Sequence, residues 1–142
     1  MHRSRILPAA MAVVLVTALL PATAKAQYGP PPQRPGAFVL GTAHVDGLTD
    51  HDDIKVGRHD GTFHFVQLRV RYAPIQFDHV VIHYGNGTAE TLRIRTYIGP
   101  GHHTRWIALP GGERVIQSLE LWYARAEPNN PTKPEVVLFG AP

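Results

Sequence analysis

The sequence predicts an all-β protein: a jelly-roll-like antiparallel sandwich of two sheets with seven or eight strands. Apolar and polar residues alternate with a period of two in Phe63–Tyr72 and in Val115–Arg125. Turn residues separate the strand-like segments, as in Gly85–Gly87 and Pro110–Gly112. No segment after residue 26 repeats apolar residues at helical spacing over three turns, so no long helix is expected there. Short strands with such turns are typical of sandwiches and jelly rolls, with an open barrel as the alternative.

The first 26 residues have the order of an export signal. A basic start, Met1–Arg5, precedes the 15-residue and almost wholly apolar run Ile6–Leu20. Small residues follow at Ala24 and Ala26, and cleavage is predicted after Ala26. The alternative, an uncleaved membrane anchor, needs about 20 apolar residues. The sequence therefore predicts an exported protein, either periplasmic or secreted.

The basic balance of the chain comes from this leader. The 14 lysines and arginines include Arg3, Arg5 and Lys25, so the remainder carries as many basic as acidic residues, 11 of each. Nucleic acid and membrane surfaces are therefore not expected as partners, because both are bound through clusters of lysine and arginine. The chain contains no cysteine, which excludes disulfides, thiolate zinc sites and cysteine nucleophiles.

Residues 27–36 contain four prolines, which disfavour strand pairing and predict an extended spacer. A single sandwich domain is expected over residues 37–142. Its strands are expected at Ala37–Val45, Ile54–Gly57, Phe63–Tyr72, Ile75–Tyr84, Thr88–Ile98, Thr104–Leu109, Val115–Arg125 and Glu135–Gly140.

The hairpin around Gly85–Gly87 has two candidate registers. A two-residue loop would place Arg93 and Arg95 on the same face of the sheet as Val80, so charged and apolar side chains would share one face. A three-residue loop with Gly87 in a left-handed bulge places Val80 opposite Leu92 instead, and moves both arginines to the wet face. Burial therefore favours the bulged loop.

Several short motifs occur in order along the chain: Leu40-Gly41, Asp46, Asp50, Ile54-x-Val56-Gly57, Leu68-x-Val70, Gly85-Asn86-Gly87, Arg105-x-Ile107-x-Leu109-Pro110-Gly111-Gly112-x-Arg114-x-Ile116 and Trp122-Tyr123. In these residues the chain resembles a bacterial family of small exported proteins classed as a domain of unknown function. The resemblance covers about Val39 to Gly140 and implies compartment and fold without an activity. Trp106 departs from the family pattern, in which an aliphatic or small polar residue is expected.

Four aspartates crowd the predicted loop before Ile54, and calcium is the one cofactor that they suggest. Calcium prefers six to eight oxygen ligands, although the spacing does not match an EF-hand. The alternative is that the carboxylates bond nearby amides and shape the turn. The candidate ligands are Asp46, Asp50, Asp52 and Asp53. Zinc is less favoured, because His79 and His83 lie about 13 Å apart along one predicted strand.

A binding module is the favoured function, with a glycan or a protein as its partner. Trp106 and Trp122 alternate away from the aliphatic positions of their strands, so both indoles face outward if the aliphatic residues face the core, and flat exposed rings stack on sugars. Arg93 and Arg95 are expected on the wet face of the hairpin, where they could line a groove for an anionic ligand. The alternatives are packed indoles and solvated arginines, and a structural protein whose sheet edge joins another chain.

No catalytic constellation is evident, so the protein is not expected to be an enzyme. The single serine after residue 26, Ser118, lies within a predicted strand and lacks a nucleophile elbow. The remaining alternative is a hydrolase, which would require a deep pocket lined by Glu120 or Asp78 together with histidines.

Overall fold

The structure, a computed structural model, describes residues 34–57 and 60–142. The predicted signal peptide and the first seven residues of the Pro-rich segment lie outside the described residues. Within the described ranges there are eight strands, and no helix long and apolar enough to cross a membrane is found there. The strands are β1 (Phe38–His44), β2 (Thr49–Lys55), β3 (Phe65–Arg71), β4 (Ile75–Tyr84), β5 (Ala89–Ile98), β6 (Ile107–Ala108), β7 (Ile116–Arg125) and β8 (Glu135–Ala141).

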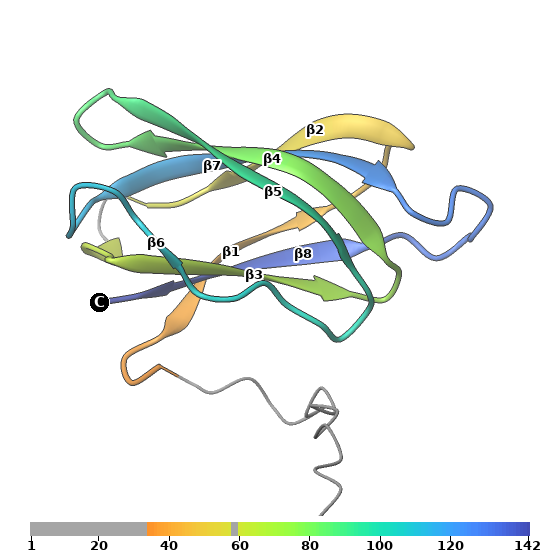
Figure 1. Cartoon of the computed structure of the whole chain (residues 1–142), viewed down its shortest axis with the longest axis horizontal. Helices are drawn as coiled ribbons and strands as arrows, with labels where there is room; N and C mark the ends of the chain where they lie inside the picture. The colour runs from red at the N-terminus through yellow and green to blue at the C-terminus, as the bar shows by residue number, and fades with distance from the viewer. Residues whose placement is uncertain (1–33, 58–59) are drawn as a thin grey trace, which may run out of the picture.

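The strands form two antiparallel four-stranded sheets that pack face to face (Figure 1). Sheet A has the order β1-β8-β3-β6, and sheet B has the order β2-β7-β4-β5. Each strand of the first half pairs with its mirror partner in the second half, β1 with β8, β2 with β7, β3 with β6 and β4 with β5. This is the pairing of a long hairpin rolled into two sheets, which defines a jelly roll. The predicted fold class is confirmed.

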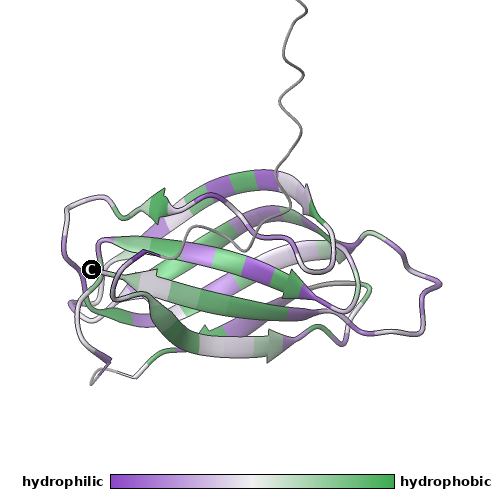
Figure 2. Cartoon of the chain, turned by 90° about the horizontal axis from the view of Figure 1, so that it is seen from below, coloured by the Kyte–Doolittle hydropathy of each residue, from purple (hydrophilic) through white to green (hydrophobic). Residues whose placement is uncertain are grey.

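The core lies between the sheets, and β4 and β7 alternate between buried and more exposed residues as their sequences predict. Figure 2 shows the corresponding alternation of hydropathy along the strands. The alternation of burial fails in β8, where six of seven residues are buried, and at Gln67 of β3, which is also buried. In β3, Val66, Leu68 and Val70 are at most 1% exposed. In the centre of sheet B, the inward residues of β4 and β7 are also buried. The largest fully buried side chains are Phe63, Phe77, Ile54, Leu68, Ile75, Ile82, Ile116, Leu119, Leu121, Leu138, Val45 and Val66.

The β4–β5 hairpin has the bulged three-residue loop that burial favours. Val80 pairs with Leu92. The amide of Gly87 donates to the carbonyl of Tyr84 at 3.0 Å, and Gly87 has a φ of 84°, which glycine adopts without strain. Arg93 and Arg95 are exposed, on the side of the sheet opposite to Val80. The register prediction is confirmed.

Two strand boundaries were predicted wrongly. The Asp-rich segment forms most of β2, which pairs with β7 along its whole length, rather than a loop. The expected strand Thr104–Leu109 is reduced to two residues. Its chain still follows β3, because His103 lies opposite Arg69 and Ile107 lies opposite Val66. From His103 to Ile107 the chain advances by four residues, whereas β3 advances by only three, from Arg69 to Val66. The extra residue interrupts the hydrogen-bonded ladder between the two segments.

The two sheets meet differently at their two long edges. Where β1 covers β2, a Cβ added to Gly41 would lie 2.5 Å from Cγ2 of Ile54, so the sheets touch there. At the other edge, the ten-residue β5 faces the two-residue β6 and the irregular chain before it. The inward residues Leu92 and Ile94 of β5 remain partly exposed as a result.

Candidate functional site

A row of rings and one arginine crosses the outer face of sheet B. Paired positions on the four strands place His51, Trp122, His79 and Arg93 side by side. The His51 ring stacks on the Trp122 indole at a centroid distance of 4.7 Å, and the His79 ring stacks on it at 5.3 Å. The three rings are within 14° of parallel, so imidazoles cover both faces of the indole. Trp122 is 38% exposed and presents its edge to solvent.

Two carboxylates hold the histidines of this face. His83 Nε2 donates to Glu120 at 2.7 Å, and the Trp122 Nε1–H donates to the other Glu120 oxygen at 3.3 Å. His79 Nδ1 lies 2.5 Å from Asp78. The hydrogen bond from His83 holds the pKa of Glu120 below its usual range, and the bond from His79 does the same for the pKa of Asp78. Both carboxylates are therefore ionised at neutral pH.

A double bulge beside this row shapes a surface pocket. Asp78 opposes two residues of β5, Ile94 and Arg95, and it has no paired residue on β7. Arg95 has a φ of 38°, in the left-handed region that a residue with a Cβ rarely adopts. The pocket has a volume of about 640 Å³ and is lined by Gln76, Phe77, Asp78, Arg95, Trp122, Tyr123 and Ala124.

The structure brings together part of the predicted ligand-binding set. Trp122 and Arg95 line this bulge pocket, and Arg93 lies on the same face. Trp106 does not join them, because it precedes β6 at the edge of sheet A. Its side chain is partly buried, and its Nε1 is buried without a hydrogen-bond partner in the described structure.

The three predicted calcium ligands whose side chains are described, Asp46, Asp52 and Asp53, do not form one cluster. Asp52 and Asp53 are adjacent in a strand, so their side chains point to opposite faces. Asp52 accepts a hydrogen bond from the Tyr123 hydroxyl at 2.5 Å, and Asp46 accepts one from Lys133 at 2.7 Å. Asp50 also lies in β2, and nothing is described of its side chain. Over residues 34–57 and 60–142, no group of three or more His, Asp or Glu side chains is arranged to hold a metal ion.

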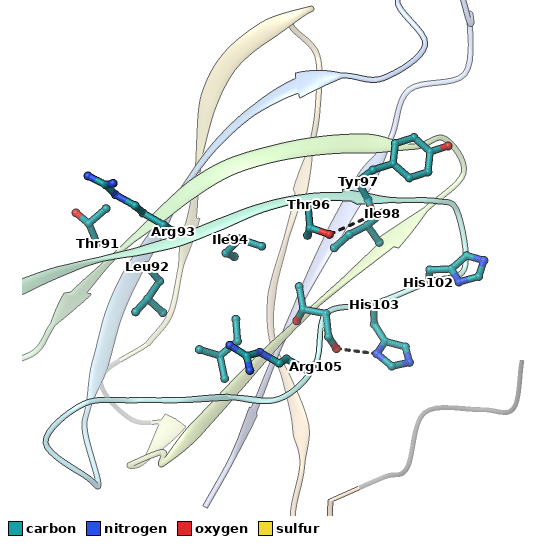
Figure 3. A pocket seen from close by; sticks show the side chains of 12 residues that line it. Thr91, Leu92, Arg93, Ile94, Thr96, Tyr97, Ile98, His102, His103 and Arg105 are labelled. Atoms are coloured by element: carbon teal, nitrogen blue, oxygen red, sulfur yellow. Dashed lines mark hydrogen bonds between the residues drawn. The ribbon is translucent and has the colours of Figure 1, made fainter. Parts of the chain in front are cut away.

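The open edge of the sandwich contains a cleft that the sequence does not reveal. It lies between β5 and the chain before β6 and has a volume of about 740 Å³ (Figure 3). This volume falls within the usual range for small-molecule sites. Its twelve lining residues are Thr91, Leu92, Arg93, Ile94, Thr96, Tyr97, Ile98, His102, His103, Thr104, Arg105 and Ile107.

The cleft combines an aliphatic interior with a basic rim. Leu92, Ile94 and Arg105 point into the space, whereas Arg93 and Tyr97 point away from it on the far side of β5 (Figure 3). His102 and His103 stand at one end. Arg105 is therefore the arginine of the lining that points into the cleft, and none of the twelve lining residues is acidic. The cleft is therefore suited to a ligand that has both apolar surface and negative charge.

The comparisons with known proteins give a family without an activity. A family model described as a domain of unknown function, DUF2541, matches residues 10–140. No curated protein matches the chain, and no solved structure matches it.

Proposed function

Because the chain belongs to the DUF2541 family, whose domain has no known function, we propose a role from geometry: an exported, non-catalytic module that binds an amphipathic anion. The observation that carries this proposal is the cleft at the open edge, which has aliphatic walls, an arginine that points inward and no acidic lining residue. Export is supported by the order of basic, apolar and small residues over the first 26 positions.

The apolar part of the ligand is inferred from incomplete burial. Leu92, Ile94 and Ile107 pack against the core on one side, yet each remains partly exposed on the other. An alkyl chain lying along them would remove this surface from water, at about 25 cal/mol for each Å². The sandwich core itself would then form the floor of the site.

The anionic part is inferred from Arg105. Its side chain is exposed, and among the described residues it has no ion pair and no hydrogen bond. A guanidinium holds a carboxylate through two parallel hydrogen bonds, which are stronger than bonds between neutral groups. Arg105 points into the cleft, so it is the residue best placed to bind the head group.

The other partners considered from the sequence receive less support. A sugar stacked on Trp122 would have to displace an imidazole, because His51 and His79 cover both faces of its ring. A protein strand added to the β5 edge would meet the bulge at Arg95, and bulges of this kind interrupt edge pairing.

Calorimetric titration with dodecanoate tests the proposal, below the concentration at which the ligand forms micelles. Binding is expected with one site per chain. Arg105→Gln is expected to weaken it by about 10-fold to 100-fold, the loss of a charge-assisted hydrogen bond. Lys55→Gln, at an exposed position of β2 on the opposite edge, is the matched control. The proposal is wrong if dodecanoate does not bind, or if both variants bind it as the wild type does.

A further inference from the structure

The geometry points to a second binding site, in the bulge pocket on the outer face of sheet B, for a sugar that carries a carboxylate. This pocket shares no lining residue with the cleft of the open edge. The inference therefore stands independently of the proposed function.

Arg95 holds an unfavourable backbone conformation in the middle of a strand. A left-handed conformation is strained for a residue with a Cβ, whereas glycine would adopt the φ of 38° without that strain. Bulges re-aim side chains and occur often beside functional sites. Here the bulge presents a guanidinium to a pocket of about 640 Å³. Strain of this kind is a reason to look for a ligand.

The Arg95 guanidinium is available to an anion. Among the described residues it forms no ion pair and no hydrogen bond, although the pKa of the nearby Asp78 is lowered in small part by its charge. A planar guanidinium matches the geometry of a carboxylate, with two donors for two oxygens. The first requirement on the ligand is therefore a carboxylate.

The rest of the pocket accepts hydroxyl groups. Asp78 uses one oxygen for His79, and its lowered pKa leaves it an ionised acceptor at neutral pH. Gln76 donates its Nε2 to the carbonyl of Phe77, which leaves its carbonyl oxygen as a second acceptor. An acceptor pair requires donors on the ligand, and a fatty acid has none at neutral pH. A hydroxylated carboxylate satisfies both requirements.

Trp122 and Ala124 form the apolar side of the pocket. The exposed edge of the indole, with its faces covered by His51 and His79, offers C–H surface rather than a stacking platform. A sugar ring turns its own C–H groups to such a surface while its hydroxyls reach Asp78 and Gln76. A hexuronate, which joins a sugar ring to one carboxylate, is the ligand class that fits.

The test is a titration of the full mature protein with glucuronate, glucose and acetate, followed by protein NMR. Glucuronate is expected to bind at millimolar concentration and at least about 10-fold more tightly than glucose or acetate, since each of these lacks one half of the contacts. The inference fails if glucuronate does not bind, or if acetate binds equally well.

Arg95→Gly separates binding from folding. The variant is expected to lose glucuronate binding while its melting temperature stays equal to that of the wild type or rises, because glycine relieves the strain. Asp78→Asn is expected to weaken glucuronate binding while leaving any weak acetate binding unchanged. Arg105→Gln, which alters the cleft, is the control and should bind glucuronate normally. Unchanged glucuronate binding by Arg95→Gly would overturn the inference.

Discussion

The two sheets pack closely at one long edge of the sandwich and remain apart at the other. At the β1–β2 edge, Gly41 has no side chain, so its backbone lies directly against Ile54 and the sheets close. At the β5–β6 edge, sheet A ends in a strand of two residues, and the side chains that β5 turns inward are only partly covered. The β1–β2 edge is closed because Gly41 has no side chain, and the β5–β6 edge is open because β6 has only two residues.

This difference explains where a ligand site is available in a chain this small. A fully sealed sandwich would use all of its inward surface for stability. The open edge leaves Leu92 and Ile94 with one side on the core and one side on the cleft. Their apolar surface can therefore be buried by a ligand instead of by the protein.

The largest effect on stability is expected from truncating two leucines of sheet B, one in the central strand β7 and one in the edge strand β5. Leu121 and Leu92 both pair with Val80, from β7 and from β5 respectively, and both face inward. Leu121 is fully buried, so Leu121→Ala should lower the free energy of unfolding by about 2–5 kcal/mol. Leu92→Ala should lower it by about 1 kcal/mol, since its site already opens to water. Urea unfolding measures both values, and equal losses would show that the β5 edge is as closed as the centre of the sheet.

The next largest loss of stability is expected from a substitution at the closed β1–β2 edge. Gly41→Ala would place a methyl group 2.5 Å from Ile54 Cγ2, and this overpacking should cost about 1–3 kcal/mol of unfolding free energy. Thr42→Ala, at the next and exposed position, is the control and should change stability little. Adding Ile54→Ala to Gly41→Ala should cost less than the sum of the two single changes, because the clash disappears. Strict additivity would contradict the contact.

The fold was largely predictable because its information is local. Alternation with a period of two in β3, β4 and β7 defines an inner and an outer face without reference to any partner strand. The Gly85–Gly87 loop then sets the β4–β5 register, since a slip of one residue would bury Arg93 and Arg95. The last residues of β2 were predicted as a strand, but its Asp-rich first part was not, because aspartate is rare in strands and only the pairing with β7 overrides that preference.

The sites were less predictable because they form between segments distant in sequence. Trp122 was identified from its alternation, but its two imidazole neighbours follow from pairing with β2 and with β4. The cleft requires that the chain leave the β3 ladder after Thr104, whose amide still donates to the carbonyl of Leu68, and no local signal in the sequence marks that departure. Arg95 was identified as a wet-face residue, whereas its left-handed backbone depends on the extra residue that faces Asp78.

The smallest effect is expected from an ion pair between the loops that flank the closed edge. Lys133, before β8, donates to Asp46, between β1 and β2, at 2.7 Å, and both side chains are mostly exposed. The bond from Lys133 lowers the pKa of Asp46. The pair should therefore stabilise the fold above the ordinary aspartate pKa of about 4 and stop doing so as the pH falls through the lowered value.

Asp46→Asn should therefore be slightly less stable than the wild type at pH 7 and equally stable at strongly acidic pH, with the difference at pH 7 shrinking in high salt. Lys133→Gln added to Asp46→Asn should change nothing further, since the pair is already broken. Urea unfolding across the pH range measures the free energy of unfolding of Asp46→Asn and allows it to be compared directly with that of Gly41→Ala. If Asp46→Asn destabilised the protein as much as Gly41→Ala, the closed edge would be held by charge at its loops rather than by contact between its sheets.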